Sequence, residues 1–211
     1  MLIELLKVTL FLFFGVFPYD LSKIICLGTE IKGLSFIMKP LFFYIEINEK
    51  KEGNQMELRP AHRDEVSLII QFIKELASYE KMSDEVQVTE ALLTKWVFEK
   101  KLAEVLLMFE DEKAIGFALY FYNFSTFLGK AGIYLEDVYI QPAYRHRGYG
   151  REVFKYLANV MLQNDLGRIE WSCLNWNQPS IDFYLKLGAK PMNEWTTFRL
   201  TRNEAEKMLN K

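Results

Sequence analysis

Residues 134 to 150 read Tyr-Leu-Glu-Asp-Val-Tyr-Ile-Gln-Pro-Ala-Tyr-Arg-His-Arg-Gly-Tyr-Gly and are the most informative part of the sequence. Residues 133 to 140 are rich in β-branched and aromatic side chains, which predicts a buried strand. Pro142 ends that strand, because proline has no N–H to donate to a sheet ladder. Arginines and glycines follow, directly ahead of a long helical pattern. The sequence therefore predicts a strand, a basic glycine loop and a helix in succession.

This order of elements suits a phosphate group. Gly148 and Gly150 let the backbone approach a ligand closely, and the first amides of the next helix point unpaired N–H groups at an anion. Arg145 and Arg147 add positive charge. The same residues also fit a plain connection between strand and helix, with the arginines in water.

The loop Arg-His-Arg-Gly-Tyr-Gly, residues 145 to 150, resembles the acetyl-CoA pyrophosphate loop of the GNAT superfamily of N-acetyltransferases. Three further stretches resemble its diamine/polyamine (spermidine/spermine and thialysine) branch: Tyr-Leu-Glu-Asp (134–137), Asn-Trp-Asn-Gln-Pro-Ser (175–180) and Phe-Tyr-Leu-Lys-Leu-Gly-Ala (183–189). The resemblance covers residues 56 to 200. It implies an α/β GNAT fold, a mixed and largely antiparallel central sheet with helices on both faces. It also implies acetyl-CoA as co-substrate and a homodimer.

Composition narrows the class of protein. The chain has 211 residues, half of them hydrophobic, which suits one domain with a sizeable core. A net charge of -2 gives no support for nucleic-acid binding. Cys26 and Cys173 lie far apart, which favours reduced thiols and a cytoplasmic protein. His62 and His146 have no metal-ligand spacing, so no metal is expected.

Residues 1 to 55 differ from the rest of the chain. The apolar run Val8 to Phe17 is too short to span a bilayer, which takes about 20 residues as a helix. Glu4 and the lack of a small-residue cleavage site also make it a poor signal peptide. We expect residues 1 to 55 to be an extension outside the fold, residues 56 to 211 to form the acetyltransferase domain, and no membrane partner. A membrane-associated N-terminus is the alternative.

Periodicity and turn residues predict the remaining elements. Strands are expected at 56–59, 104–109, 114–122, 168–176 and 192–200. Helices are expected at 63–80, from Thr89 to about 100, from 148 onward, from Asn177 to Gly188, and at 203–210, with a loop at 123–130.

The resemblance implies where acetyl-CoA binds. The pyrophosphate would be held by the loop residues Arg145, His146, Arg147, Gly148, Tyr149 and Gly150, with Arg147 and Arg151 as charge partners. The backbone of Val138, Tyr139 and Ile140 would bind the pantetheine arm, and one amide, that of Val138, would stabilise the oxyanion. Asn177, Ser180 and Tyr184 would also contact the cofactor.

The resemblance further implies direct transfer to a primary amine, with two proton-transfer residues. Glu136 would receive the amine proton through a water, although a strand acid can also simply pair with a surface cation. Tyr184 would be the general acid for the departing thiolate, although a tyrosine one turn before a helix-ending glycine can also be core. Cys173 is not expected to carry the acetyl group, since no base is evident beside it.

The sequence indicates the residues that bind the amine substrate less specifically than those that bind acetyl-CoA. Related enzymes place substrate contacts at Tyr79 and Glu80, and Glu136, Asp137 and Trp195 are candidates for the same pocket. Trp195 also fits an anchor for the last strand. The spermidine/spermine enzymes carry an acid where this chain has Ser-Thr at 125–126. Its loss favours a short diamine or a lysine-like amine over a long polycation.

Three functions therefore compete. The first is acetylation of a small diamine, polyamine or lysine-like amine. The second is acetylation of protein lysines or N-terminal amines, which needs an open groove for a peptide. The third is a catalytically silent acetyl-CoA-binding sensor, against which the presence of Glu136 and Tyr184 argues.

Overall fold

The structure is a computed structural model that describes residues 56 to 210. The predictions made for residues 1 to 55 lie outside the described residues. No helix within residues 56 to 210 is long and apolar enough to cross a membrane.

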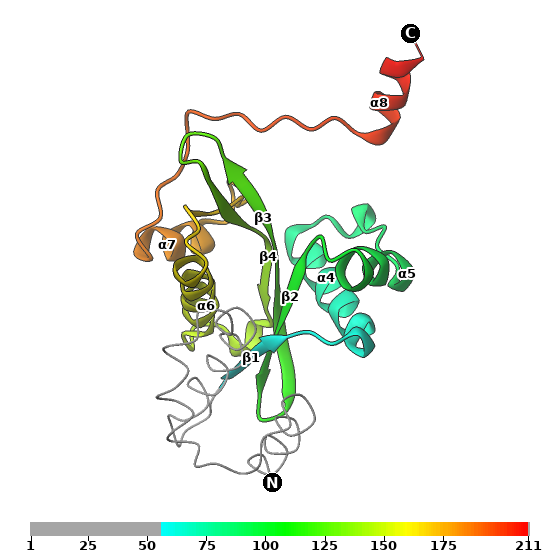
Figure 1. Ribbon diagram of the computed structural model, residues 1–211. Coiled ribbons are helices and arrows are strands. Elements are labelled where there is room, and N and C mark those ends of the chain that lie inside the picture. Colours follow the sequence, from blue (N-terminus) through cyan, green and yellow to red (C-terminus); the bar gives the residue numbers. More distant parts are fainter. Residues whose placement is uncertain (1–55, 211) are drawn as a thin grey trace, which may run out of the picture. The chain divides into compact units, whose positions relative to one another are not determined.

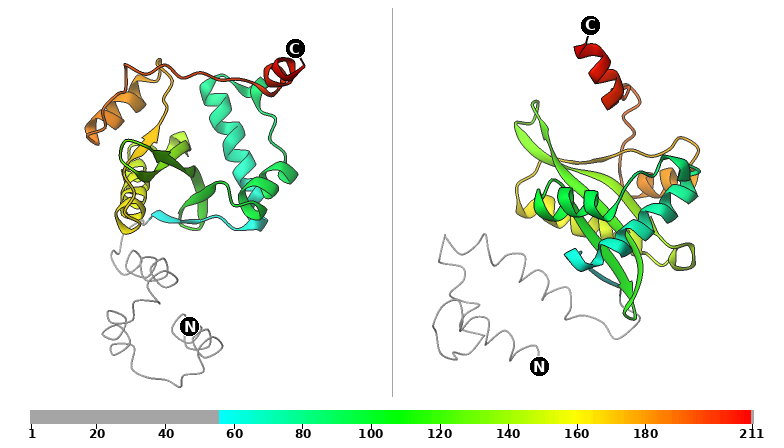
Figure 2. Two further views of the ribbon diagram at one scale, coloured as in Figure 1. Left: turned by 45° about the horizontal axis from the view of Figure 1, so that its top comes forward. Right: turned by 90° about the vertical axis from the view of Figure 1, so that its right-hand side faces the viewer.

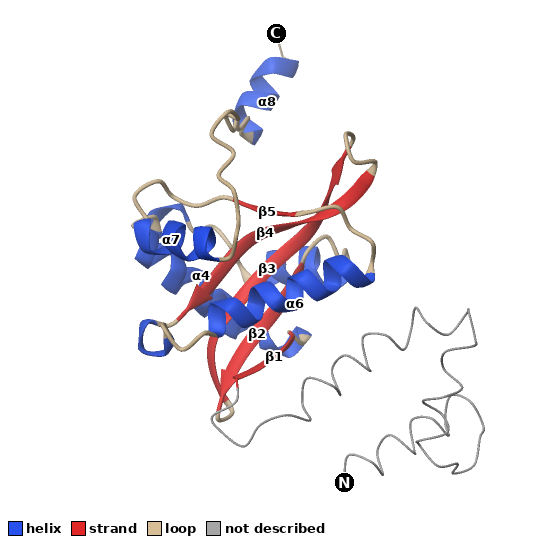
Figure 3. Ribbon diagram, turned by 90° about the vertical axis from the view of Figure 1, so that its left-hand side faces the viewer, coloured by secondary structure: helices blue, strands red, loops and turns tan. Residues whose placement is uncertain are grey.

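A five-stranded sheet forms the centre of the domain (Figure 1). Its strands follow one another in sequence order: β1 (Met56–Pro60), β2 (Glu104–Glu110), β3 (Lys113–Ser125), β4 (Lys130–Ile140) and β5 (Ile169–Trp171). The first four pair antiparallel, and β5 pairs parallel to β4. Figure 3 shows β5 as a short strand beside β4. The prediction of a mixed, largely antiparallel sheet is confirmed.

Helices cover both faces of this sheet (Figure 2). The first face carries η1 (Arg63–Glu65), α4 (Val66–Glu80), η2 (Ser83–Glu85), α5 (Glu90–Leu93) and η3 (Thr94–Glu99). The second carries α6 (Tyr149–Gln163), which follows the short η4 (Pro142–Tyr144), and α7 (Gln178–Lys186). Thr89 caps α5 by accepting a hydrogen bond from the Leu92 amide, as predicted. The chain ends in the exposed α8 (Arg202–Leu209).

Two hydrophobic clusters hold the layers together, one on each face. Alternation along β3 sends Phe117 into the cluster with α4 and Tyr120 into the cluster with α6. Phe72 of α4 stacks on Phe117 at 6.2 Å, and Leu157 of α6 is fully buried on the other side. Both sheet faces are therefore buried under helices.

A β-bulge breaks the regular pairing of β4. Leu119 pairs with Asp137, but the next residue, Tyr120, pairs with Leu135, so Glu136 is an extra residue on β4. Such a bulge bends its strand. Beyond Leu135, β4 also loses its pairing with β5, which ends at Trp171. The two parallel strands therefore part from this point on.

Three predicted elements differ in the structure. The β3–β4 hairpin is longer than predicted, because the loop expected at 123–130 contracts to a turn at 126–129. The strand predicted at 168–176 is only Ile169–Trp171, since β4 bends away from its continuation. The strand predicted at 192–200 does not form; within residues 56 to 210 the segment pairs with no strand, and Phe198 is 90% exposed.

Candidate active site

A pocket of about 660 Å³ lies where β4 and β5 part. Sixteen of the predicted site residues line it: Tyr79, Glu80, Glu136, Asp137, Val138, Tyr139, Ile140, Arg145, His146, Gly148, Tyr149, Gly150, Arg151, Asn177, Ser180 and Tyr184. They come from the end of α4, from β4, from the loop into α6 and from the start of α7. The fold therefore brings these distant parts of the sequence to one cavity.

The loop between β4 and α6 has the conformation that a glycine permits. Gly148 is the N-cap of α6 and adopts a φ of 89°, in the left-handed region. A Cβ built there would meet no atom within 4 Å, so the space beside this residue is open to a ligand. Gly150 instead faces the Phe183 ring, which would lie 3.2 Å from an added Cβ. Gly148 permits the backbone conformation of the loop, and Gly150 permits close packing of α6 against α7.

The two arginines of the loop have different surroundings. Arg145 lines the pocket; its Nε donates to the Ile140 carbonyl oxygen at 2.8 Å, and its guanidinium lies 4.5 Å from the centre of the Tyr79 ring. Arg147 does not line the pocket. It pairs with the buried Glu110 at 3.0 Å and donates to the Ala143 carbonyl oxygen. Arg147 is thus held at the back of the loop, whereas Arg145 and Arg151 face the cavity.

Tyr79 connects α4 to the start of α7. Its hydroxyl donates to Asn177 Oδ1 at 3.1 Å, and its ring lies 5.9 Å from that of Trp176. The same Asn177 oxygen accepts from the Ser180 amide at 3.4 Å, which caps α7. The end of α4 is therefore joined to both the loop, through Arg145, and the α7 cap.

Three of the four carboxyl groups that line this pocket, those of Glu80, Glu136 and Asp137, interact with one another. Burial raises the pKa of Asp137 to about 6, and the charges of Glu136 and Glu80 add to the effect. Burial also raises the pKa of Glu80. Glu136 is exposed at the bulge. A carboxyl with a pKa near neutrality suits a general base, and the cluster as a whole suits a cation.

Tyr184 lies in an aromatic cluster with Trp171, Phe154 and Phe183, at centroid distances of 5.1 to 5.7 Å. Burial, followed by Cys173 and Glu80, raises its pKa above the ordinary value, so the hydroxyl stays protonated at neutral pH. Burial and Glu80 likewise raise the pKa of the Cys173 thiol. Tyr184 is therefore a hydrogen-bond donor, and Cys173 is a poor nucleophile.

Comparison with known proteins identifies this arrangement. The family model described as "Acetyltransferase (GNAT) family" matches residues 70–189, which include the loop, the acidic cluster and Tyr184. The chain belongs to the GNAT acetyltransferase family. It is therefore an acyltransferase enzyme, as the loop and its neighbouring motifs predicted.

Two curated proteins place this acetyltransferase within the family. It is 33% identical over 160 residues to thialysine N-epsilon-acetyltransferase of Bos taurus, covering 72% of this chain and 94% of that protein. It is 31% identical over 159 residues to spermidine/spermine N(1)-acetyltransferase-like protein 1 of Homo sapiens, covering 70% of this chain and 23% of that protein. The predicted resemblance to the diamine/polyamine branch is confirmed.

A solved structure agrees on the fold. A predicted acetyltransferase from Clostridium acetobutylicum, determined with acetyl-CoA, superposes with a TM-score of 0.58 at 20% identity. The match covers 69% of this acetyltransferase and 97% of that chain. The GNAT fold expected from the sequence is therefore the fold observed.

Trp195 is the second predicted site residue that the structure does not bring to the pocket. It lies in the unpaired segment after Gly188 and is 71% exposed. The reason is that the strand predicted at 192–200, which contains Trp195, does not form. Among residues 56 to 210, no group of three or more His, Cys, Asp and Glu side chains is placed to hold a metal ion.

The pocket also contains residues that the sequence analysis did not single out, notably Trp171, Ser172 and Lys186. Trp171 packs on Tyr184, and Lys186 adds a positive charge from α7. Lys186 could have been found from helical spacing, because it lies one turn after Asp182, which also lines the pocket. No pattern in the sequence indicated Ser172, because its place in the pocket depends on where β5 ends.

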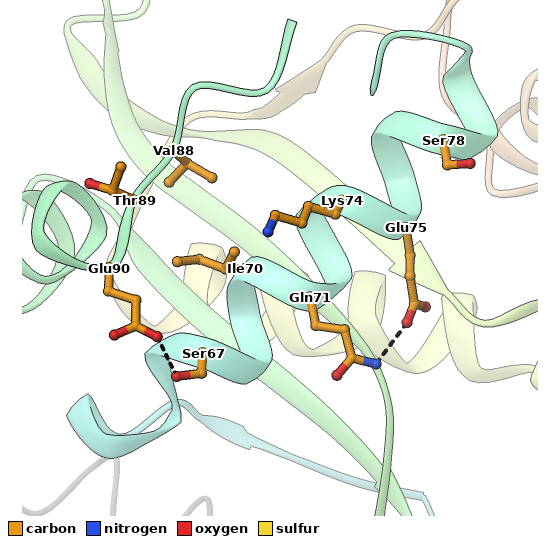
Figure 4. A pocket seen from close by; sticks show the side chains of 9 residues that line it. All are labelled: Ser67, Ile70, Gln71, Lys74, Glu75, Ser78, Val88, Thr89 and Glu90. Carbon is orange, nitrogen blue, oxygen red and sulfur yellow. Dashed lines mark hydrogen bonds between the residues drawn. The ribbon is translucent and has the colours of Figure 1, made fainter. Parts of the chain in front are cut away.

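A second hollow lies between α4 and the segment before α5 (Figure 4). It is lined by Ser67, Ile70, Gln71, Lys74, Glu75, Ser78, Val88, Thr89 and Glu90. Several of these side chains bond one another: Ser67 donates to Glu90 at 2.6 Å and Gln71 to Glu75 at 2.8 Å. This hollow contains neither the glycine loop nor Tyr184, so we place the chemistry in the first pocket.

Proposed function

We propose that this enzyme transfers the acetyl group of acetyl-CoA directly to a primary amine of a small diamine, polyamine or lysine-like substrate. One observation carries the proposal: a single pocket contains both a glycine loop suited to pyrophosphate and the cluster of Glu80, Glu136 and Asp137, which suits a cationic amine. The names of the related thialysine and spermidine/spermine-like proteins agree with a basic small molecule.

In this proposal the loop and α6 hold acetyl-CoA. The open space beside Gly148 accommodates the pyrophosphate, and the first amides of α6 with Arg145 and Arg151 neutralise its charge. Val138, Tyr139 and Ile140 pair with β3 on one edge of β4, and the other edge, beyond the end of β5, provides backbone hydrogen-bonding groups for the pantetheine arm. The Val138 amide stabilises the oxyanion. Acetyl-CoA supplies an activated thioester; the protein supplies position and charge.

The carboxyl pair Glu136 and Asp137 handles the proton of the amine. A lysine-like ammonium with a pKa of about 10.4 is almost fully protonated at neutral pH and cannot attack a thioester. Asp137 is ionised above its pKa of about 6, and Glu136 lies beside it on the bulge. We propose that these two groups and Glu80 bind the ammonium and that the pair accepts its proton.

Tyr184 assists the leaving sulfur. Its raised pKa makes full proton transfer to a thiolate of pKa about 8.5 unfavourable, so its contribution is a hydrogen bond that strengthens as charge develops. The Asn177 side-chain oxygen accepts hydrogen bonds from the Tyr79 hydroxyl and the Ser180 amide, and in this proposal Asn177 also contacts the cofactor.

Thiol release from acetyl-CoA across a panel of amines tests the proposal. The panel contains thialysine, lysine, ornithine, a short diamine, spermidine, spermine, a lysine peptide and a peptide with a free N-terminus. We expect turnover with the short lysine-like amines and weaker turnover with the long polyamines. Turnover with peptides alone would indicate a protein acetyltransferase. Acetyl-CoA binding without thiol release for any amine would indicate a sensor.

We also propose that the enzyme acts as a homodimer in the cytoplasm. Residues 192 to 200 pair with no strand within residues 56 to 210, and Trp195, Phe198 and Leu200 are 71%, 90% and 62% exposed. A second copy is a partner that can cover this segment, because exposed apolar side chains favour burial against another chain. The free thiol of Cys173 fits a reducing compartment.

Light scattering after size exclusion tests the dimer. The intact chain is expected to have twice the mass of one chain, and Phe198→Asp to shift it towards a single chain. Leu162→Asp is the matched control, because Leu162 is also exposed, at 72%, but lies on α6. A monomeric intact chain, or equal effects of the two variants, would contradict this part of the proposal.

A further inference from the structure

The glycine loop has a second set of contacts, on the side away from the pocket. Glu110, the last residue of β2, is 7% exposed and lies between two loop residues. Arg147 Nη1 donates to its two carboxylate oxygens at 3.1 and 3.0 Å, and the Tyr149 hydroxyl donates to Oε1. One buried carboxylate therefore holds residues on both sides of Gly148.

The neighbouring end of the β2–β3 hairpin contacts the same loop. Lys113 Nζ lies 5.2 Å from the centre of the Tyr144 ring, and the Arg147 guanidinium lies 5.1 Å from it. The backbone amide of Gln141 donates to the Ile115 carbonyl oxygen at 2.9 Å. The loop is thus supported along its length by residues 110 to 115.

The loop backbone requires such support. His146 and Gly148 adopt φ values of 63° and 89°, and the left-handed region is unfavourable for a residue with a side chain such as histidine. Arg147 lies between them, and its side chain is bonded to Glu110 and to the Ala143 carbonyl oxygen. A buried charge that loses its partner is costly, so the pair resists any movement of Arg147 away from Glu110.

We infer that Glu110 is a positioning residue for acetyl-CoA: through Arg147 and Tyr149 it holds the glycine loop, with His146 and Gly148 left-handed, in the shape that receives the pyrophosphate. The inference rests on the proposed function of the pocket. Glu110 itself does not line the pocket and acts only through its two partners. Arg147 accordingly shapes the loop and does not bind phosphate, which replaces the role that the sequence predicted for it.

The first test needs no ligand. Hydrogen exchange of the backbone amides of residues 145 to 150 is measured in the intact chain and in Glu110→Gln, which keeps the size of the side chain and removes its charge. We expect exchange in this loop to become about tenfold faster, with the rest of the sheet unchanged, because a local contact has been lost. Unchanged exchange in the loop, or faster exchange throughout the sheet, would overturn the inference.

The second test measures acetyl-CoA affinity by calorimetry and turnover at saturating acetyl-CoA. We expect Glu110→Gln to weaken binding on the order of tenfold while turnover at saturation stays within about twofold, since positioning the loop affects binding and not the chemical step. Glu99→Gln is the matched control: it also removes a carboxylate that pairs with an arginine at 3.0 Å, but at the far exposed pair Arg63–Glu99. Equal affinity in the Glu110 variant and the wild type would overturn the inference.

Two further variants keep the test decisive if Glu110→Gln folds poorly. Tyr149→Phe removes only the hydroxyl that donates to Glu110 and is expected to weaken binding in the same direction by about threefold. Adding Arg147→Gln to Glu110→Gln is expected to weaken binding little further, because partners of one contact are not additive. Full additivity, or no effect of Tyr149→Phe, would count against the inference. A wild type that does not bind acetyl-CoA would refute the proposed function, whereas the exchange result concerns the loop alone.

Discussion

The loop after β4 and the segment after α7 differ in where their side chains find partners. In the loop, Arg145 and Arg147 are both bonded within the same chain, one towards the pocket and one towards Glu110. In residues 192 to 200 every residue is exposed, including Trp195 and Phe198. The pocket is therefore assembled by one chain, whereas the proposed dimer would cover the last segment with a second copy. Substitutions in the pocket should change activity equally at every protein concentration. The effects of substitutions in residues 192 to 200 should instead depend on protein concentration.

The largest effect is expected from Tyr184→Phe, which keeps the aromatic packing and removes only the hydroxyl. We expect turnover to fall on the order of 10²- to 10³-fold, the range for losing one hydrogen-bond donor to a charge that develops in the transition state, with acetyl-CoA affinity unchanged. Steady-state kinetics and calorimetry measure the two quantities. The loss should be the same at every enzyme concentration. A loss below about twofold, outside the range for such a hydrogen-bond donor, would mean that Tyr184 is only part of the aromatic cluster.

The second effect concerns the carboxyl pair at the bulge. Because the base must be ionised, the rate at limiting amine should rise with pH as Asp137 loses its proton near its pKa of about 6. Asp137→Asn is expected to lower the rate on the order of 10²-fold and to abolish this limb of the pH profile. In Glu136→Gln the limb should remain. The same limb in both variants would assign the ionisation to another group.

Direct transfer predicts sequential kinetics and an active Cys173→Ala. Burial keeps the Cys173 thiol protonated, so it is not prepared to accept the acetyl group. Ping-pong kinetics, or an inactive Cys173→Ala that folds normally, would indicate a covalent acetyl-enzyme.

A third and smaller effect is expected at the glycine loop. Gly148→Val forces a β-branched residue into a φ of 89° and fills the open space beside it, so the KM for acetyl-CoA should rise by about tenfold or more. The KM for the amine should change little. Calorimetry checks the cofactor directly, and an unchanged acetyl-CoA affinity would show that the pyrophosphate binds elsewhere.

Local patterns in the sequence were enough to predict much of this molecule. The strand, glycine loop and helix from residue 133 onward and the cap at Thr89 depend on neighbours in sequence and were predicted from them, whereas most of the sixteen pocket residues were implied by the resemblance to the GNAT family. The role of Arg147 could not be predicted, because its partner Glu110 is 37 residues away on another strand. The strand predicted at 192–200 was wrong because a strand forms only where another strand pairs with it, and within residues 56 to 210 no strand pairs with this segment.

A fourth effect concerns stability and follows from Asp137. Its pKa in the folded protein, about 6, exceeds the unfolded value of about 3.9, so its ionisation costs stability as pH rises between these two values. Asp137→Asn removes that cost. The variant should melt at a higher temperature than the wild type at neutral pH and show no such gain below the unfolded pKa. Thermal scans at the two pH values measure this, and a gain of equal size at both would point to packing instead of charge.

The smallest effect is expected from removing residues 1 to 55. The described sheet starts at Met56, and β1 pairs with β2 along its whole length, from Met56 opposite Glu110 to Pro60 opposite Leu106. The family match begins later, at residue 70. A chain beginning at Met56 should therefore fold, bind acetyl-CoA with the affinity of the full chain and keep its dimer, since the pocket and the exposed last segment both lie after this residue. Circular dichroism, calorimetry and light scattering on the two chains make the comparison. Loss of folding in the shorter chain would give residues 1 to 55 a structural role, and a lost dimer with intact folding would place the contact between copies in those residues and not in 192 to 200.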